Sequence, residues 1–318
     1  MTKPFQKVDR SKFGHKHLLG ISDLSREEIE IILDLANYYA DNLDNRAFKP
    51  DILRGAIVLT LFFEDSTRTR TSFEVAAKRL GAEVVNLDMK SSAESKGETF
   101  MDTILTLNAM LHPDAIVVRH KEYGAPAFIA SRVPCPVLNA GDSWHEHPTQ
   151  ALLDALTIRR RLGKIEGLKV AICGDVSHSR VAASNIDLLT KLGATVNIVA
   201  PPALLPEKLK DGVQAFDSME AGLKECDVVM MLRNQYERME AGLIKSEADF
   251  FDQYGLDKEK LAYAKPDALI MHPGPMNRGV EISDDVADDP NRSMILEQVR
   301  NGVPTRMAVL DLLLKGQF

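Results

Sequence analysis

Short apolar runs alternate with amphipathic stretches along most of this chain. Residues 56–63, 115–119, 169–173 and 195–199 have the length and composition of buried strands, and apolar residues at helical spacing fill much of the sequence between them. Strands that alternate with helices favour a parallel sheet with right-handed crossovers. We therefore predict an α/β protein with two doubly wound parallel-sheet domains.

The length of 318 residues suits two domains. A helix predicted to begin at Pro148 would bridge the two halves, and a last helix is predicted from Pro304 to Leu314, with Pro304 at its start. We expect one domain to comprise residues 1–148 and 302–318 and the other residues 149–301. Interdomain helices would join them, with the active site in the cleft.

Composition excludes several classes of function. A formal net charge of −7 argues against a broad nucleic-acid surface. No run of about 18 apolar residues is present, so no membrane span is expected. The polar N-terminal segment, without an apolar signal, predicts a cytoplasmic protein. The three cysteines have neither metal-binding spacing nor a CxxC pair, and we expect buried reduced thiols at Cys135, Cys173 and Cys226.

The turn after the first apolar run is rich in groups that bind anions. Residues 66–70, Ser-Thr-Arg-Thr-Arg, lie between that predicted strand and a helical pattern that ends at Gly81. The start of a helix presents free N–H groups and the positive end of its dipole, and hydroxyls and guanidiniums add donors here. This combination predicts a phosphate site. The alternative is simple helix capping, because residues 71–74 fit a capping box.

Other predicted strands also end in polar, mostly basic residues. In open parallel sheets, ligands bind outside the carboxyl ends of the strands, so these side chains are expected to converge on a ligand. The residues at these ends are Arg119, Arg180, Arg233 and His272, together with the turn at 66–70.

Two motifs argue against common cofactors. The stretch Gly174–Arg180 lies where a dinucleotide-binding loop would be, but it lacks the second and third glycines, so NAD(P) is not expected. An alternative to a ligand-binding role for this stretch is that Asp175 and Arg180 form a structural ion pair. His145-Glu146-His147 is not HExxH and has no third ligand nearby, so no metal is expected. A histidine at a helix entry suits a hydrogen bond to a ligand carbonyl.

Two later loops suit the ends of a small polar ligand. Arg233 and Gln235 share a face of an extended segment and suit a carboxylate, although a solvated charged loop is the alternative. The loop His272-Pro273-Gly274-Pro275 offers carbonyl acceptors but few donors. A cis bond between Gly274 and Pro275 would point neighbouring carbonyls at a ligand amino group, and we state it as a hypothesis.

Taken in order, these motifs resemble the transcarbamoylase family. The resemblance extends from about residue 15 to the C-terminus, and the Phe-Phe-Glu and Arg-x-Gln forms are similar to the branch that uses aspartate. The loop at Gly274 departs from the better-known His-Pro-Leu-Pro form. The matching segments are residues 62–74, Ser92 to Lys96, Arg119-His120, 147–150, Arg233-x-Gln235 and 272–275.

The resemblance implies a role for each matching residue. Carbamoyl phosphate would be bound by Ser66, Thr67, Arg68, Thr69, Arg119, His147, Gln150, Pro273 and Gly274. Aspartate would be bound by Lys96, Arg180, Arg233 and Gln235. Ser92 and Lys96 would come from a neighbouring subunit of a homotrimer. Glu64 would meet Arg180 and Arg238 between the domains. The groups nearest the reaction would be Arg68, Thr69, Arg119, His147, Gln150 and Lys96.

The resemblance also implies the reaction. The first domain would bind carbamoyl phosphate and the second aspartate, and direct attack of the amine would require neither cofactor nor metal. The alternatives are a transcarbamoylase for another amine such as ornithine and an inactive scaffold with the same fold. Ornithine would need a carboxylate near Arg233, and none is apparent in the sequence. The sequence leaves open whether regulatory or other partner chains bind the trimer.

Overall fold

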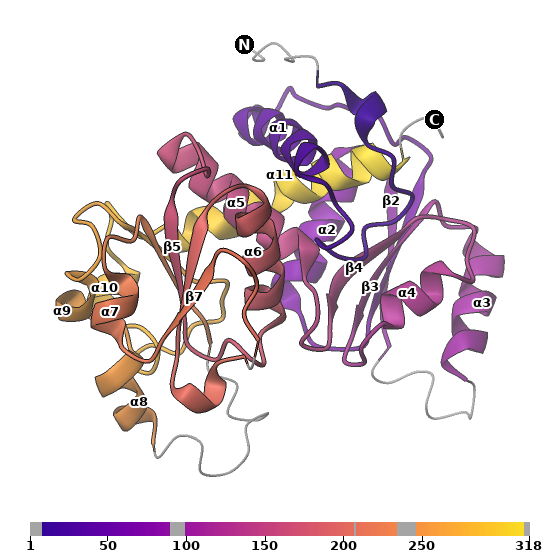
Figure 1. Cartoon of the computed structure of the whole chain (residues 1–318). Coiled ribbons are helices and arrows are strands. Elements are labelled where there is room, and N and C mark those ends of the chain that lie inside the picture. Colours follow the sequence, from indigo (N-terminus) through magenta and orange to yellow (C-terminus); the bar gives the residue numbers. More distant parts are fainter. Residues whose placement is uncertain (1–7, 90–98, 207, 234–245, 315–318) are drawn as a thin grey trace. The chain divides into compact units, whose positions relative to one another are not determined.

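A computed structural model of the chain describes residues 8–89, 99–206, 208–233 and 246–314. The chain divides into two compact units, the first formed by Met1–Leu156 and Asn301–Phe318 and the second by Thr157–Arg300 (Figure 1). Each unit contains one parallel sheet with helices between its strands. The predicted fold class, two doubly wound parallel-sheet units, is therefore confirmed.

The sheet of the first unit has the strand order β2-β1-β3-β4. Its strands, all parallel, are β1 (Ile57–Phe62), β2 (Glu83–Asp88), β3 (Ala115–His120) and β4 (Val137–Asp142). The chain moves from β1 outward to β2 and then returns to the other side of β1 with β3. The strand order therefore reverses between β1 and β3, which is where doubly wound folds bind ligands.

Helices of the first unit lie between these strands in the sequence and also before and after them. Helix α1 begins with a capping box formed by Ser25 and Glu28. The residues of α5 and α11 are divided between the two units. The helical segments are η1 (Arg10–Lys12), α1 (Arg26–Asn42), α2 (Thr67–Arg79), α3 (Phe100–Leu111), α4 (Ala125–Ala130), α5 (Pro148–Leu162) and α11 (Ile295–Leu314).

The last helix differs from the prediction. We expected it to begin at Pro304, but α11 begins at Ile295 and contains Pro304 in its interior. Proline there removes one helical N–H and costs about 3 kcal/mol. The helix continues because its later residues, Leu310 and Leu314 among them, are fully buried, and that burial offsets the loss.

The second unit repeats the design with five parallel strands in the order β7-β6-β5-β8-β9. The strands are β5 (Lys169–Cys173), β6 (Thr195–Val199), β7 (Val213–Phe216), β8 (Val228–Met231) and β9 (Leu269–Met271). The order reverses between β5 and β8. The connecting segments are α6 (Arg180–Lys191), η3 (Pro202–Leu204), α7 (Met219–Leu223), α8 (Glu247–Tyr254), α9 (Lys258–Leu261) and α10 (Asp284–Ala287).

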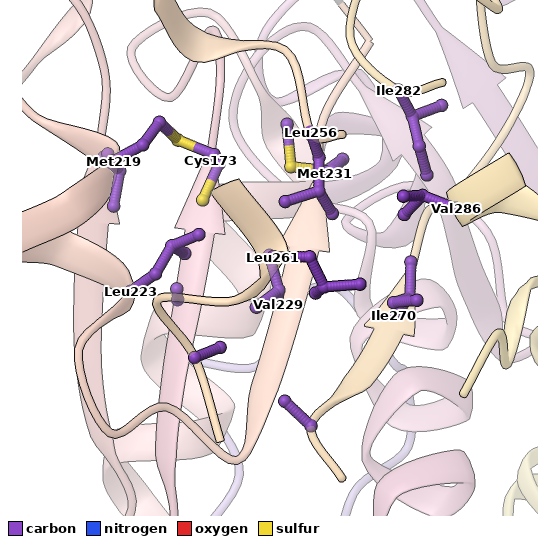
Figure 2. Close-up of a cluster of buried hydrophobic side chains, with 14 of the residues drawn as sticks. Cys173, Met219, Leu223, Val229, Met231, Leu256, Leu261, Ile270, Ile282 and Val286 are labelled. Carbon is purple, nitrogen blue, oxygen red and sulfur yellow. The ribbon is translucent and has the colours of Figure 1, made fainter. Parts of the chain in front are cut away.

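Side chains from alternate strand positions form the core on one face of this second sheet. Figure 2 shows Cys173 of β5, Met231 of β8 and Ile270 of β9 within one buried cluster that also includes Leu223 of α7. Ile282 belongs to the same cluster, so the far end of the loop after β9 is anchored in the core. All three cysteines are free and buried, as predicted.

Helix composition also bears on membranes. Every helix among the described residues is too short or too polar to cross a bilayer.

Candidate active site

The carboxyl ends of three neighbouring strands bring the predicted residues of the first unit to one sheet edge. Phe62 lies opposite Arg119 in the parallel register, and the Phe63 N–H donates to the Arg119 carbonyl at 2.9 Å. The turn at 66–69 follows β1 directly, and His147 follows β4. Arg119 is thus placed between the predicted phosphate turn and the start of α5, at the switch point of this sheet.

The start of α2 has the properties of an anion site. The helix begins at Thr67, and the hydroxyl of its N-cap residue, Ser66, makes no capping hydrogen bond. Its first turn contains no acidic residue. Thr69 is buried, whereas Arg68 is exposed and forms no ion pair with any described residue. The start of this helix therefore combines uncapped N–H groups, hydroxyls and a positive charge.

The capping-box alternative for residues 71–74 is wrong. These residues lie inside α2 rather than at its start, because the helix begins at Thr67. The Ser72 hydroxyl instead donates to the Thr69 carbonyl of the preceding turn, at 3.0 Å. This local hydrogen bond is typical of a serine within a helix.

Arg119 has a partner that the sequence did not reveal. Its Nε lies 3.3 Å from Oε2 of Glu64, and its Nη1 donates to the Ala140 carbonyl at 3.4 Å. Both side chains of the pair are largely buried. The pair holds the Arg119 guanidinium at the sheet edge. The predicted contacts of Glu64 with Arg180 and Arg238 stay predictions, and Arg238 lies outside the described residues.

The entry to α5 presents the next two predicted residues. His147 and Gln150 are both buried, and the Gln150 N–H donates to the His147 carbonyl at 2.9 Å. The Gln150 side chain donates from Nε2 to Oδ1 of Asp154, also at 2.9 Å. Asp154 was not predicted as a functional residue, although its position four residues after Gln150 on a helix is a signal that points to such a contact.

The neighbouring histidine has different surroundings. His145 Nδ1 lies 3.3 Å from Asp142 Oδ2, and its ring packs against Tyr123 with 4.4 Å between the centroids. Among the residues that the structure describes, no group of three or more His, Cys, Asp or Glu side chains is arranged to hold a metal ion.

In the second unit, the predicted aspartate-binding residues flank the switch point of the sheet. Arg180 is the first residue of α6, which follows β5, and Ser179 caps that helix by accepting from the Ala182 N–H at 3.2 Å. Arg233 follows β8, the strand that pairs with β5. Four other predicted site residues lie outside the described part of the chain: Ser92, Lys96, Gln235 and Arg238.

The loop between β5 and α6 contains a buried acid. Asp175 is fully buried, and its Oδ1 lies 2.8 Å from Nδ1 of His178 and accepts from the His178 N–H at 3.3 Å. Gly174 has a φ of +117°, a conformation that favours glycine at this turn. The structure therefore places His178 against Asp175, a contact that the sequence analysis did not include.

A buried dyad shapes the loop after β9. The Gly274 N–H donates to Nδ1 of His272 at 2.9 Å, so that nitrogen carries no proton. The other ring nitrogen, Nε2, therefore donates to Oε1 of Glu281 across 3.2 Å. The same carboxylate oxygen accepts from the Asn277 N–H at 2.5 Å. The dyad thus fixes the loop that carries Pro273.

The peptide bond between Gly274 and Pro275 is cis, as hypothesised. His272 and Glu281 are both fully buried, whereas residues 273 and 274 are partly exposed. The rigid interior of the loop therefore supports an exposed edge of carbonyl groups.

Both halves of the chain match models of one family. Residues 16–160 match the carbamoyl-P binding domain of aspartate/ornithine carbamoyltransferase, and residues 166–313 match the Asp/Orn binding domain. The chain belongs to the aspartate/ornithine carbamoyltransferase family.

Individual relatives refine this result. The chain is 58% identical to the aspartate carbamoyltransferase catalytic subunit of Rhodospirillum centenum, over 97% of both chains. It resembles the solved structure of aspartate transcarbamoylase from Trypanosoma cruzi with carbamoyl phosphate, at a TM-score of 0.84, 31% identity and coverage of 96% and 98%. It also resembles the ornithine carbamoyltransferase of Pyrococcus furiosus, at a TM-score of 0.85, 30% identity and coverage of 94% and 97%.

Proposed function

We propose that this chain transfers the carbamoyl group of carbamoyl phosphate to the amine of L-aspartate, giving N-carbamoyl-L-aspartate and phosphate. The observation that carries the proposal is that each sheet has anion-binding side chains at its switch point. Ser66 to Thr69 and Arg119 flank the first switch point, and Arg180 and Arg233 flank the second. A donor with a phosphate group and an acceptor with two carboxylates match this distribution of charge.

We assign the phosphate of the donor to the start of α2. The uncapped N–H groups of this helix and the Ser66, Thr67 and Thr69 hydroxyls would donate to its oxygens. Arg68 is exposed at this position without an ion-pair partner among the described residues, and its charge would balance that of the phosphate. Arg119 would complete the phosphate site from β3.

The chemistry follows from the donor itself, because carbamoyl phosphate is already an activated acyl compound. The uncharged amine of aspartate attacks the carbamoyl carbon, and negative charge develops on the carbonyl oxygen. Thr69, Arg119 and His147 would donate to that oxygen, and one such donor typically stabilises a transition state by about 3 kcal/mol. Phosphate leaves and takes the proton of the amine. This assignment needs neither a covalent intermediate nor a side-chain base.

We assign the remaining site residues to the carbamoyl NH₂ group and to aspartate. Gln150 and the carbonyls of Pro273 and Gly274 would accept from the carbamoyl NH₂. Arg180, Arg233 and Gln235 would bind the two carboxylates of aspartate. We expect carbamoyl phosphate to bind before aspartate, and domain closure with Glu64 against Arg180 and Arg238 to follow.

The proposal also concerns the assembly. Ser92 and Lys96 would reach the site from a neighbouring subunit, which makes a homotrimer the active form. We place the reaction in the cytoplasm, in pyrimidine biosynthesis. The trimer is supported by the resemblance to the family alone.

Ornithine is the second candidate acceptor, because the P. furiosus ornithine enzyme has the same fold. The fold therefore does not select the acceptor. Two observations favour aspartate: the similarity to catalytic subunits named for it, and the presence of Arg233 after β8, where the cationic side chain of ornithine would need a carboxylate. An ornithine enzyme would also be expected to have His-Cys-Leu-Pro at residues 272–275, which are His-Pro-Gly-Pro here.

A direct assay tests the reaction and the acceptor together. The purified protein is supplied with carbamoyl phosphate and either aspartate or ornithine, and carbamoylated amine and released phosphate are both measured. We expect equal amounts of N-carbamoylaspartate and phosphate, and no carbamoylation of ornithine. An absence of product with aspartate would overturn the proposal.

Substitution of Arg68 tests the phosphate site. Arg68→Ala should lower kcat/KM for carbamoyl phosphate by about 100-fold or more, because a charged donor to the leaving group is lost. The free energy of unfolding should change by less than about 0.5 kcal/mol, since the side chain is exposed. Arg79→Ala in the last turn of the same helix is the matched control and should leave kcat/KM unchanged. Retained activity in the Arg68 variant, with a large loss of stability, would contradict the assignment.

A further inference from the structure

A buried polar cluster lies behind the side chain of Gln150. The Gln150 Nε2 donates to Oδ1 of Asp154 at 2.9 Å, one turn further along α5. Asp154 is fully buried. An ionised carboxylate accepts hydrogen bonds and never donates them. The contact therefore fixes which end of the Gln150 amide faces Asp154: the NH₂ is directed toward the carboxylate, and Oε1 is the end left for a ligand.

Arg306 carries a positive charge that interacts electrostatically with Asp154. This arginine of α11 is buried, and burial lowers its pKa to about 9, opposed by the charge of Asp154. The guanidinium is therefore still protonated at neutral pH. Its Nη1 donates to the Gly302 carbonyl at 3.1 Å, and its Cζ lies 4.9 Å from the centre of the Phe73 ring.

The cluster links three helices of the first unit. Gln150 and Asp154 belong to α5, Arg306 to α11, and Phe73 to α2, the helix whose start is the phosphate turn. A Cβ at Gly302 would lie 2.6 Å from the Arg306 Nη1, so a side chain there would displace the guanidinium. The orientation of the Gln150 amide is therefore set by contacts that do not themselves touch the substrate.

We propose that Asp154 is a positioning residue that presents Gln150 Oε1 as a hydrogen-bond acceptor and so selects a donor with a carbamoyl NH₂ group. The inference rests on the proposed function. A carbamoyl group donates hydrogen bonds from its NH₂, whereas the methyl group of the isosteric acetyl phosphate donates none. An acceptor fixed at this position distinguishes the two compounds, and an amide free to rotate does not.

The test compares carbamoyl phosphate with acetyl phosphate. Asp154→Asn keeps the shape of the side chain but adds a donor, so Gln150 is no longer held in one orientation. We expect kcat/KM for carbamoyl phosphate to fall by about tenfold or more, the loss of one buried hydrogen bond. The inhibition constant of acetyl phosphate, measured against carbamoyl phosphate, should change less than twofold. The ratio of the two constants, which a general loss of structure does not move selectively, reports on positioning.

Asp311→Asn is the matched control. Asp311 is another buried carboxylate of the first unit, and it accepts from Tyr39 and Arg10 rather than from a proposed site residue. This variant should lose stability without changing the ratio. An unchanged ratio in the Asp154 variant, or an equal change in both variants, would overturn the inference.

A second variant and the wild-type assay complete the test. If Asp154→Asn does not fold, Gly302→Ala replaces it, because the added Cβ displaces Arg306; the same fall in the ratio is expected, and its absence would refute the inference. A wild-type protein without activity toward aspartate would refute the proposed function instead, so the two failures are distinguishable.

Discussion

At the scale of single residues, burial changes the chemistry of the three cysteines. Burial raises the pKa of the Cys135 thiol to about 11 and that of Cys226 to about 12, and it raises the pKa of Cys173 well above its ordinary value. A thiol reacts as its thiolate. The native protein therefore holds all three side chains as neutral, unreactive thiols at neutral pH.

The raised pKa values predict loss of stability in alkaline solution. In the unfolded chain these thiols ionise near pH 9, whereas Cys226 in the native protein keeps its proton up to about pH 12. The native state thus binds more protons between these values, so its stability is complete below pH 9 and declines as the pH rises toward 12. At pH 10 the loss is about 1.4 kcal/mol per thiol.

Urea unfolding of the wild type and of Cys226→Ala at pH 8 and pH 10 measures this effect. The variant should be less stable at both values, but its stability should decline by about 1.4 kcal/mol less between them. An equal decline in both proteins would show that Cys226 does not contribute to the alkaline loss.

Sequence reasoning located the site residues that follow strands but missed their partners. Ser66, Arg119 and Arg180 were predictable because each lies at the end of a predicted strand or on the turn that follows it. The pair of Glu64 with Arg119 was not, because it joins the ends of two strands whose register only the folded sheet defines. The dyad of His272 with Glu281 was not, because it depends on the path of an irregular loop. Asp154 was predictable in principle from its spacing of four residues after Gln150 on a helix. A charged residue at a position predicted to be buried would have been the signal.

At the scale of elements, the loop from β9 to α10 is stabilised by its own buried residues. One carboxylate oxygen of Glu281 accepts from the Asn277 N–H and from His272, while Ile282 is anchored in the core cluster of Figure 2. The carbonyls of residues 273 and 274 therefore rest on a buried support rather than on a solvated loop.

Removal of that support should affect both stability and the donor site. Glu281→Ala leaves a buried imidazole N–H and a backbone N–H without an acceptor, each costing about 1–3 kcal/mol. We expect a loss of about 2 kcal/mol or more in the free energy of unfolding and a raised KM for carbamoyl phosphate. Asp285→Ala, at an exposed acid on the same stretch, is the control and should leave the KM for carbamoyl phosphate unchanged. An unchanged KM in the Glu281 variant would show that the dyad does not support binding of carbamoyl phosphate.

Element bounds were predictable where the apolar pattern was continuous. The strands 169–173 and 195–199 agree with β5 and β6 residue for residue. Short elements without such a pattern were missed, among them α4 and the partly exposed edge strand β7. Pro304 misled the prediction of α11, because proline favours the first turn of a helix and only tertiary packing shows that it is interior here.

At the scale of the whole molecule, the first unit is built from two separate parts of the chain. Residues 301–318 belong to it together with residues 1–156. Asp311 of α11 accepts from Arg10 at 2.6 Å and from the Tyr39 hydroxyl at 2.7 Å. The second unit, residues 157–300, is continuous. The two units therefore differ in what each needs in order to fold.

Fragments test that difference. Residues 157–300 expressed alone should unfold cooperatively in urea, because their core cluster is complete. Residues 1–156 alone should not, since α11 is missing and its apolar partners are exposed. A fusion that appends residues 301–318 to residue 156 through a flexible linker should restore a cooperative transition. Cooperative unfolding of residues 1–156 without the appended segment would contradict this expectation.

The discontinuity of the first unit has a consequence for biosynthesis. A ribosome delivers residues 157–300 before the helix that completes the unit begun earlier. During translation the later unit is thus able to finish first, while the earlier one waits with an uncovered apolar surface for the final segment. The order in which the units mature in the cell is then the reverse of their order in the gene, and the waiting half is the one we expect chaperones to bind.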